Sequence, residues 1–562
     1  MTTTAGRPWL SSYAEGVPAE VDVPDGSLVD LLGEAARRFG PRVALDFYGA
    51  TTTYAELEAQ VSRSASALAG LGVRAGDRVG LVLPNCPQHV VAFYAALRLG
   101  AVVVEHNPLY TKAELTHQLA DHGARVVVVW DKVVPAVTAG RPGTAVETVV
   151  SVDLTSALPR LKRLALRLPL AKARATRAAM SAPAPDATPW ERLVASAAPL
   201  PAGHPRPLAG DTALLQYTGG TTGRPKGAVL SHRNLLANAT QGRVWVPGLR
   251  DGEETIYAVL PLFHAYGLTL CLTFAMSIGA TLVLFPRFDV EAVLAAVSRR
   301  APTFLPAVPP IYRALATQAR ERGMDLTSIR YGISGAMSLP PAVVDSWEQV
   351  TGGLLVEGYG MTETSPITLG NPVSDARRPG TVGVPFPSTE IRIVDPDDPS
   401  VERGPGEPGE LLVRGPQVFS GYWQRPEETA EVLLADGWLR TGDVVTMSPD
   451  GFVTVVDRIK ELIITGGFNV YPSEVEDALR RLDGVADAAA VGMPGPDGGE
   501  QVVAAVVVEE GATLDPDEVR RGSRTHLAGY KVPTRVVLVQ ELPRSLIGKV
   551  LRREVRDQLS QD

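Results

Sequence analysis

Runs of apolar residues alternate with segments of helical periodicity between residues 42 and 130. The apolar runs are short and rich in valine and leucine, which is typical of buried strands. The segments between them repeat apolar residues every three or four positions, as helices that pack on a sheet do. This alternation predicts successive βαβ units. Strands are expected at residues 78–83, 101–104 and 125–129, and helices at residues 88–99 and after the capping boxes Thr53-x-x-Glu56 and Thr111-x-x-Glu114.

A longer apolar run, residues 265–286, carries no formal charge and has the length of a membrane span. Small and polar residues interrupt it, and Gly279 separates a helix-like half from the β-branched run 281–285. We therefore expect a buried helix followed by a buried strand.

The second half of the chain continues with strands and then becomes rich in turns. Between residues 380 and 456 glycine and proline are frequent, and Pro449-Asp-Gly451 predicts a hairpin. A chain of 562 residues exceeds what one hydrophobic core usually serves, so two to four modules of an α/β protein are expected. Further strands are expected at residues 256–259, 330–334, 354–357 and 502–508, and a helix after the capping box Ser473-x-x-Glu476.

Charge and cysteine content narrow the class of protein. The formal net charge of −8 argues against nucleic acid as a partner. The two cysteines, Cys86 and Cys271, lie far apart and lack the spacing of a metal site, which suits a reducing compartment. The first 22 residues contain no apolar segment typical of a secretory signal. A cytoplasmic protein is therefore expected.

Residues 157–180 differ from the surrounding pattern. They contain seven cationic residues and no acid, interleaved with leucine and alanine. One interpretation is an amphipathic segment that rests on anionic lipid, which would place the protein peripherally at the inner face of the membrane. The other is a solvated surface insertion, and Pro159 and Pro169 disfavour one long helix. The sequence leaves both open.

Residues 218–227 carry the densest candidate chemistry, reading TGGTTGRPKG between two apolar runs. Glycines let backbone N–H groups converge on an anion, threonine hydroxyls donate further hydrogen bonds, and Lys226 adds a mobile positive charge. The loop differs from the P-loop of nucleotide kinases, because Lys226 follows Pro225 and precedes Gly227. We predict a phosphate-binding loop at the tip of a strand-loop-strand element.

Two later strand ends also carry polar residues. The run 330–334 ends in Gly335-Ala336, which nearly completes Gly-x-Ser-x-Gly but lacks its last glycine, so a serine-hydrolase site fits poorly. The run 354–357 leads into Gly358-Tyr-Gly-Met-Thr-Glu363, with Glu363 where a dinucleotide-binding fingerprint needs glycine. A carboxylate beside a threonine suits magnesium and phosphate better.

Taken in order, these segments resemble the adenylate-forming superfamily, which includes acyl-CoA synthetases, luciferases and the adenylation domains of peptide synthetases. The similarity spans roughly residues 42–555. Its seven motifs are the phosphate loop, residues 260–267 around His264, the turn at Gly335, residues 358–363, Trp438-Leu-Arg-Thr-Gly-Asp443, residues 455–467 and the segment 542–552 around Lys549.

The resemblance implies a domain organisation. A large N-terminal domain, residues 1–456, would contain βαβ layers and a β-rich subdomain at about 380–456. A small mobile α+β domain, residues 457–562, would follow a hinge at Asp457.

The resemblance also implies site residues. Lys549, Glu363, Thr218 and His264 would be catalytic, and Glu363 and Thr218 would hold Mg²⁺. Tyr359 would stack on adenine, and Asp443 would accept the ribose hydroxyls. The residues implied to bind nucleotide or co-substrate are Thr218, Gly219, Gly220, Thr221, Thr222, Gly223, Lys226, Gly335, Ala336, Glu357, Gly358, Tyr359, Gly360, Thr362, Asp443, Arg458, Gly466 and Gly467.

The reaction so implied joins a carboxylic acid to ATP and then to coenzyme A. Details of the phosphate loop, the N-terminal segment and the basic insertion resemble bacterial long-chain fatty acyl-CoA synthetases, so a fatty acid is the expected substrate. The alternatives are a ligase for aryl or medium-chain acids, an acyl-adenylate ligase that loads a carrier protein, and an inactive lipid-binding scaffold.

Overall fold

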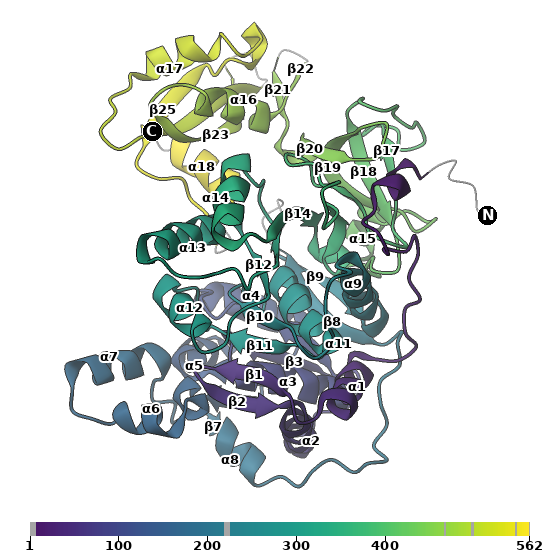
Figure 1. Cartoon of the computed structure of the whole chain (residues 1–562), viewed down its shortest axis with the longest axis vertical. Helices are drawn as coiled ribbons and strands as arrows, with labels where there is room; N and C mark the ends of the chain where they lie inside the picture. Colours follow the sequence, from purple (N-terminus) through teal and green to yellow (C-terminus); the bar gives the residue numbers. More distant parts are fainter. Residues whose placement is uncertain (1–6, 219–224, 466–467, 496–499, 546–547, 561–562) are drawn as a thin grey trace.

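The computed structural model describes residues 7–218, 225–465, 468–495, 500–545 and 548–560 (Figure 1). Within these ranges, the larger of two main sheets has nine strands, parallel in its centre and antiparallel at both edges. Its strands, in spatial order, are β16 (Val384–Pro385), β15 (Ile367–Gly370), β14 (Leu354–Gly360), β13 (Tyr331–Ser334), β12 (Phe304–Ala307), β10 (Thr255–Ala258), β11 (Thr281–Leu284), β1 (Val43–Phe47) and β2 (Ala50–Thr53).

A second sheet has seven strands in the described chain, all paired in parallel except the last two. The expected strands at 78–83, 101–104 and 125–129 are its β3, β4 and β5, so the predicted βαβ units are confirmed. In spatial order the strands are β7 (Thr188–Pro189), β6 (Thr148–Val152), β5 (Val126–Trp130), β3 (Arg78–Val82), β4 (Val102–Glu105), β8 (Thr212–Thr218) and β9 (Lys226–Ser231).

Helices connect and cover these strands. The capping boxes at Thr53 and Thr111 are confirmed, since each threonine hydroxyl accepts from the glutamate amide three residues on and each glutamate bonds back. The helix α3 is buried along all but its first residue, as expected for a helix enclosed on every side. The helices of this part are α1 (Leu28–Phe39), α2 (Tyr54–Gly70), α3 (Pro87–Arg98), α4 (Lys112–His122), α5 (Val134–Gly140), α8 (Trp190–Ala195), α9 (His232–Trp245), α12 (Val290–Val297), α13 (Pro309–Arg322), α14 (Pro341–Thr351) and α15 (Pro426–Val432).

The uncharged run 265–286 forms α10 (Ala265–Gly267), a π-helical turn (Leu268–Thr273), α11 (Phe274–Ile278) and then β11. Nearly all of it is buried, which confirms the expected helix and strand. Among the described helices, none combines the length and apolar character needed to cross a membrane.

Residues 390–458 form an antiparallel sheet of four strands, confirming the β-rich expectation. The predicted hairpin at Pro449–Gly451 joins its last two strands. The strands are β17 (Glu390–Val394), β18 (Gly409–Arg414), β19 (Leu439–Met447) and β20 (Val453–Arg458).

The C-terminal part packs around apolar clusters of its own and lies beyond β20 in Figure 1. This arrangement confirms the α/β class with a smaller C-terminal unit, whereas the boundary and hinge at Asp457 stay predictions. Its elements are β21 (Ile463–Thr465), β22 (Phe468–Val470), α16 (Pro472–Arg480), β23 (Val485–Pro494), β24 (Glu500–Val508), α17 (Pro516–Ser523), β25 (Arg535–Val539) and α18 (Arg552–Leu559).

The expected capping box at Ser473 is wrong. The helix α16 begins one residue earlier, at Pro472, and its N-cap is Tyr471, without a side-chain cap. Proline tolerates the first helical position because its missing N–H would be unpaired there anyway. Ser473 and Glu476 instead bind the hinge segment and Arg552, as described below.

Candidate functional site

One cavity of about 920 Å³ gathers most of the residues that the sequence singled out. Its walls come from the strand ends of both main sheets, from the β-rich sheet and from the C-terminal part. The expected site residues that line it are Thr218, Lys226, His264, Gly335, Ala336, Glu357, Gly358, Tyr359, Gly360, Thr362, Glu363, Arg458 and Lys549. Expected residues that lie outside the described residues are Gly219, Gly220, Thr221, Thr222, Gly223, Gly466 and Gly467.

The stems of the predicted phosphate loop are β8 and β9, which pair antiparallel so that Thr218 faces Lys226. The predicted strand-loop-strand element is therefore confirmed at both flanks. The Lys226 ammonium lies 5.1 Å from the centre of the Tyr422 ring. A cation is thus held at the base of the loop, at the cavity wall.

Glu363 follows β14 in a 3-10 turn, Thr362–Thr364, and is buried. The Tyr422 hydroxyl donates to its Oε1 at 2.7 Å. Burial raises the pKa of Glu363 above its ordinary value, because it disfavours the charged form of the carboxylate. A nearby cation would stabilise that charged form. Mg²⁺ prefers one or two carboxylates together with phosphate oxygens, and Glu363 fits that donor set once a nucleotide is bound.

Tyr359, Asp443 and Arg458 form a chain of polar contacts at the next wall. The Tyr359 hydroxyl donates to Asp443 Oδ2, and Arg458 Nε lies 2.9 Å from Asp443 Oδ1. Asp443 itself is buried, just behind the lining residues Thr441 and Gly442. Each carboxylate oxygen accepts more than one hydrogen bond, so Asp443 retains capacity for a diol.

His264 precedes α10, and its Nδ1 accepts from the Tyr266 amide at 3.2 Å. Burial lowers the pKa of His264 to about 4. The ring is therefore neutral at pH 7, and with Nδ1 as acceptor the proton sits on Nε2. His264 can act there as a hydrogen-bond donor rather than as a cation.

The turn at Gly335 and the start of the Gly358 motif form the remaining polar wall. Ala336 adopts a left-handed conformation, φ +66°. Burial raises the pKa of Glu357 to about 8, although a hydrogen bond from the Leu339 backbone acts in the opposite direction and lowers the pKa. At Gly360, a Cβ would come within 1.8 Å of the Pro366 carbonyl oxygen, so only glycine fits where β14 turns toward Glu363.

Lys549 enters the same cavity from the C-terminal part. Gly548 before it has φ +81°, and a Cβ there would approach Met337 Sδ to 3.1 Å, so the tail passes close to the N-terminal part. Burial is the main cause that lowers the pKa of Lys549 to about 8, and the positive charge of the Arg458 guanidinium is the next largest. The ammonium form still predominates at pH 7.

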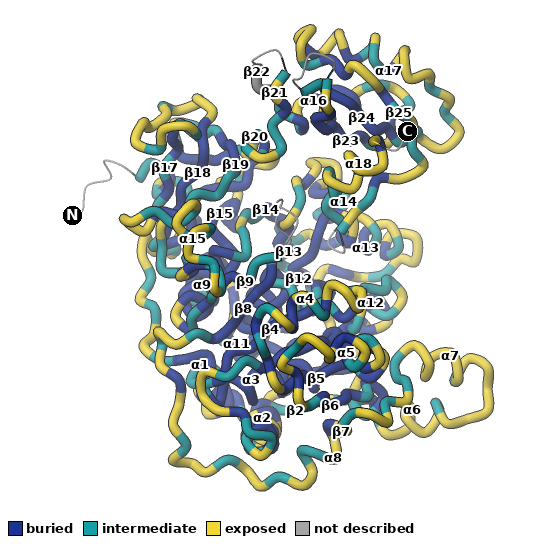
Figure 2. The backbone as a smooth tube through the Cα atoms, turned by 180° about the vertical axis from the view of Figure 1, so that it is seen from behind, coloured by how far each residue is buried: buried dark blue, intermediate teal, exposed yellow. Residues whose placement is uncertain are grey.

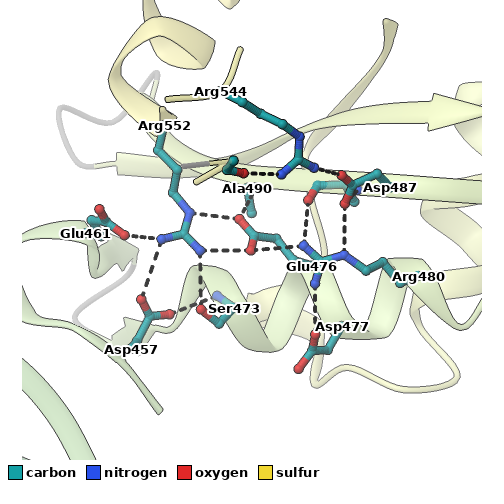
Figure 3. Close-up of polar contacts among 12 residues, drawn as sticks. Asp457, Glu461, Ser473, Glu476, Asp477, Arg480, Asp487, Ala490, Arg544 and Arg552 are labelled. Atoms are coloured by element: carbon teal, nitrogen blue, oxygen red, sulfur yellow. Dashed lines mark hydrogen bonds and ion pairs between the residues drawn. The ribbon is translucent and has the colours of Figure 1, made fainter. Parts of the chain in front are cut away.

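A network of ion pairs supports the segment that carries Lys549 (Figure 3). Arg552 donates to both carboxylate oxygens of Glu476 at 2.8 Å, to Ser473 Oγ at 3.2 Å and to Glu461. The Asp457 carboxylate accepts from the Arg458 and Ser473 amides, each at 2.8 Å. The predicted hinge residue is thereby bound to the first turn of α16.

On the opposite side of Lys549, Arg544 donates to the Gly548 carbonyl at 2.7 Å and to Asp487. The Lys549 carbonyl accepts from the Ser545 amide at 2.8 Å, which closes the turn. Neither arginine was singled out from the sequence. The available signal was the short spacing of Arg544 and Arg552 around Lys549.

The other half of the cavity is apolar, and the sequence analysis did not find it. Trp245 and Phe386 stack there with ring centres 4.4 Å apart, and Trp245 Nε1 donates to the Asn371 carbonyl at 3.1 Å. These side chains come from separate elements, so no local pattern brings them together. Apolar lining residues of this half are Gly242, Trp245, Val246, Leu270, Phe274, Phe304, Ile333, Ile367 and Phe386.

Comparison with known proteins places these features in a family. The model of the AMP-binding enzyme family matches residues 32–423, and that of the AMP-binding enzyme C-terminal domain matches residues 474–549. The long-chain-fatty-acid–CoA ligase of Bacillus subtilis (strain 168) is 37% identical over 98% of both chains. The feruloyl-CoA synthase of an Amycolatopsis species is 39% identical over 92% of this chain and 96% of that one.

Among solved structures, ATP-bound MatB from Rhodopseudomonas palustris superimposes with a TM-score of 0.81 and 31% identity, covering 94% of this chain and 98% of that chain. Both the family matches and these relatives extend from the first βα units to the Lys549 segment. The chain therefore belongs to the AMP-binding enzyme family, the adenylate-forming enzymes that its motifs resemble.

Proposed function

We propose that this enzyme activates a long-chain fatty acid with ATP to an acyl-adenylate and then transfers the acyl group to coenzyme A. The observation that carries the proposal is the convergence of Lys549, Glu363 and Thr218 on one cavity whose other half is apolar. A polar end suits the nucleotide and the reacting carboxylate, and the apolar end suits an alkyl chain. The near full-length relative from Bacillus subtilis bears the name of this activity.

In the first step, a carboxylate oxygen attacks the α-phosphorus of ATP and the bond to pyrophosphate breaks. Two anions meet in this step, so a cation between them stabilises the transition state most. Lys549 is assigned that role, while Lys226 and the loop hydroxyls would neutralise the departing pyrophosphate. Mg²⁺ held by Glu363 and Thr218 would supply further charge neutralisation.

Nucleotide orientation is assigned to the remaining wall residues. Tyr359 would stack on the adenine, with Gly335, Ala336 and Glu357 around it. Asp443 and Arg458 would bind the ribose. His264, neutral at pH 7, would donate a hydrogen bond near the reacting carboxylate.

In the second step, the coenzyme A thiol loses its proton and attacks the acyl carbonyl, and AMP leaves. The site faces Lys549 in the structure, so the C-terminal part would rotate about Asp457 to withdraw the lysine and admit the thiol. The two amides that bind the Asp457 carboxylate come from Arg458, the last residue of β20, and from Ser473 in the first turn of α16.

An aryl acid is the second candidate substrate, favoured by the identity to the feruloyl-CoA synthase. The test is pyrophosphate release across acids from acetate to oleate, with benzoate and coumarate included. We expect the highest kcat/KM with long alkyl acids. A maximum at coumarate would make the enzyme an aryl-acid ligase, and no release with any acid would contradict the proposed function. Replacing coenzyme A with a carrier domain separates the ligase from a carrier-loading enzyme.

The proposed function also involves residues 157–180, which lie outside the cavity. A long-chain acid partitions into lipid, and peripheral contact of residues 157–180 with a membrane would bring the enzyme to it.

A further inference from the structure

Residues 160–180, here called the basic insertion, lie almost entirely on the surface. They form two short helices, α6 (Arg160–Ala165) and α7 (Ala171–Met180), with Pro169 between them. Neither helix buries a residue, and Figure 2 shows both as exposed chain that projects from the body. Helices this short are marginal without tertiary packing, so a surface that covers them would stabilise them.

Exposed leucines concentrate in this insertion. Among the described residues, eleven large apolar side chains are exposed, and four of them lie within ten residues of each other. Isolated exposed leucines are ordinary, whereas such a cluster indicates an interaction site. The four are Leu161, Leu164, Leu168 and Leu170, exposed to 81%, 56%, 50% and 59%.

The charge of the insertion opposes that of the protein. It contains seven cations and no acid, so the rest of the chain carries −15 when the total is −8. In the part of the chain that the structure describes, none of the seven pairs with a carboxylate. Lys162 and Arg163 bind backbone carbonyls, and the Lys162 ammonium also lies 5.9 Å from the centre of the Tyr48 ring. A partner of this surface must therefore be anionic and must also accept apolar side chains.

The C-terminal end of the insertion is fixed to the body. The Trp130 indole donates to the Met180 carbonyl at 2.9 Å, and Ser181 Oγ donates to Asp131 at 2.6 Å. Both anchors lie next to β5, β6 and β7, at the edge of the seven-stranded sheet opposite β8 and β9. Contact through the insertion would thus leave the cavity beside the phosphate loop uncovered.

We propose that the basic insertion is a docking surface for a bilayer containing anionic phospholipid. The leucines enter the boundary between headgroups and acyl chains, and the cations lie at the phosphate level. The anionic cytoplasmic leaflet attracts such a polybasic segment, whereas the remaining negative surface is repelled. The proposal deepens the proposed function, since the acid would be taken from the layer on which the enzyme rests.

The test is flotation of the full-length protein with vesicles of phosphatidylcholine, with or without phosphatidylglycerol, and with no acid present. We expect binding only with phosphatidylglycerol. Removing three charges in K172Q/R174Q/R177Q should weaken it about 100-fold, from about fivefold per cation. The variant L161S/L164S/L168S/L170S should weaken it at least about tenfold. The matched exposed controls L208S/V401S and R521Q/R524Q should bind as the natural chain does.

Pyrophosphate release with a short acid in solution is measured on every variant and should be unchanged. Absence of vesicle binding by an enzyme that releases pyrophosphate would overturn the docking proposal and leave the proposed function intact. Loss of binding in the charge variant but not in the leucine variant would also overturn it, because attraction by charge alone would then account for the binding and the leucines would not enter the bilayer. Vesicle binding without pyrophosphate release would count against the proposed function alone.

Discussion

The change Arg552→Met tests whether the ion-pair network positions Lys549. Arg552 holds both oxygens of Glu476, which is 5% exposed, and lies three residues after Lys549. Methionine retains much of the aliphatic packing but removes every charged hydrogen bond. A buried ion pair that loses one partner typically costs about 3–5 kcal/mol, so the C-terminal part should unfold at lower temperature.

The expected effect of Arg552→Met on the rate of adenylation follows from the position of Lys549. A displacement of about 1 Å in a reacting group can cost about 100-fold, and loss of one positioned electrostatic contact costs about 100- to 1,000-fold. We therefore expect Arg552→Met to slow acid-dependent pyrophosphate release by about 100-fold at saturating ATP. The conversion of supplied acyl-adenylate with coenzyme A should fall much less, because the proposed mechanism gives Lys549 no role in that step.

The assay measures both half-reactions at a temperature where circular dichroism shows the variant folded. Arg552→Lys, which keeps the charge but not the forked geometry, should recover part of the rate. Equal loss in both half-reactions, or an unchanged rate of pyrophosphate release, would refute the positioning role.

Three further predictions concern the cavity. Because burial lowers the pKa of Lys549 to about 8, its ammonium form is lost as pH rises through that value, so kcat/KM for adenylation should fall above about pH 8 in a pH profile; a flat profile to pH 9.5 would contradict this. Trp245→Ala should raise the ratio of kcat/KM for long-chain acids to kcat/KM for medium-chain acids, at a cost of ~3–5 kcal/mol of stability. The control Trp347→Ala truncates a buried tryptophan away from the cavity, and it should cost a similar amount of stability without changing that ratio. Glu363→Gln should slow adenylation at least about 100-fold and raise the Mg²⁺ concentration needed, while Tyr422→Phe should change it less than about tenfold; similar losses would argue against a metal-binding role for Glu363.

Local patterns in the sequence accounted for most of the architecture. Valine-rich runs predicted β3, β4 and β5, and the capping boxes predicted where α2 and α4 begin, because strand burial and helix capping depend on neighbouring residues. The motif of Ser473 misled for the same reason. Its neighbours match a cap, but Pro472 and the contacts of Asp457 and Arg552, which are distant in sequence, decide where α16 begins.

Thirteen residues of the cavity wall were predictable because each belongs to a compact motif. The apolar residues were not, since Trp245 and Phe386 lie 141 residues apart in the sequence and meet only in the folded chain. The hydroxyl of Tyr422 on Glu363 is a similar case. Individual apolar residues carry no sign of whether they line a cavity or fill a core.

The most direct measurement is the pair of half-reactions in Lys549→Ala. If a lysine from the C-terminal tail promotes the joining of acid and nucleotide, this variant will lose pyrophosphate release by about 100- to 1,000-fold and yet convert supplied acyl-adenylate with coenzyme A near the natural rate. Pyrophosphate release at the natural rate, or an equal loss in both half-reactions, would contradict it.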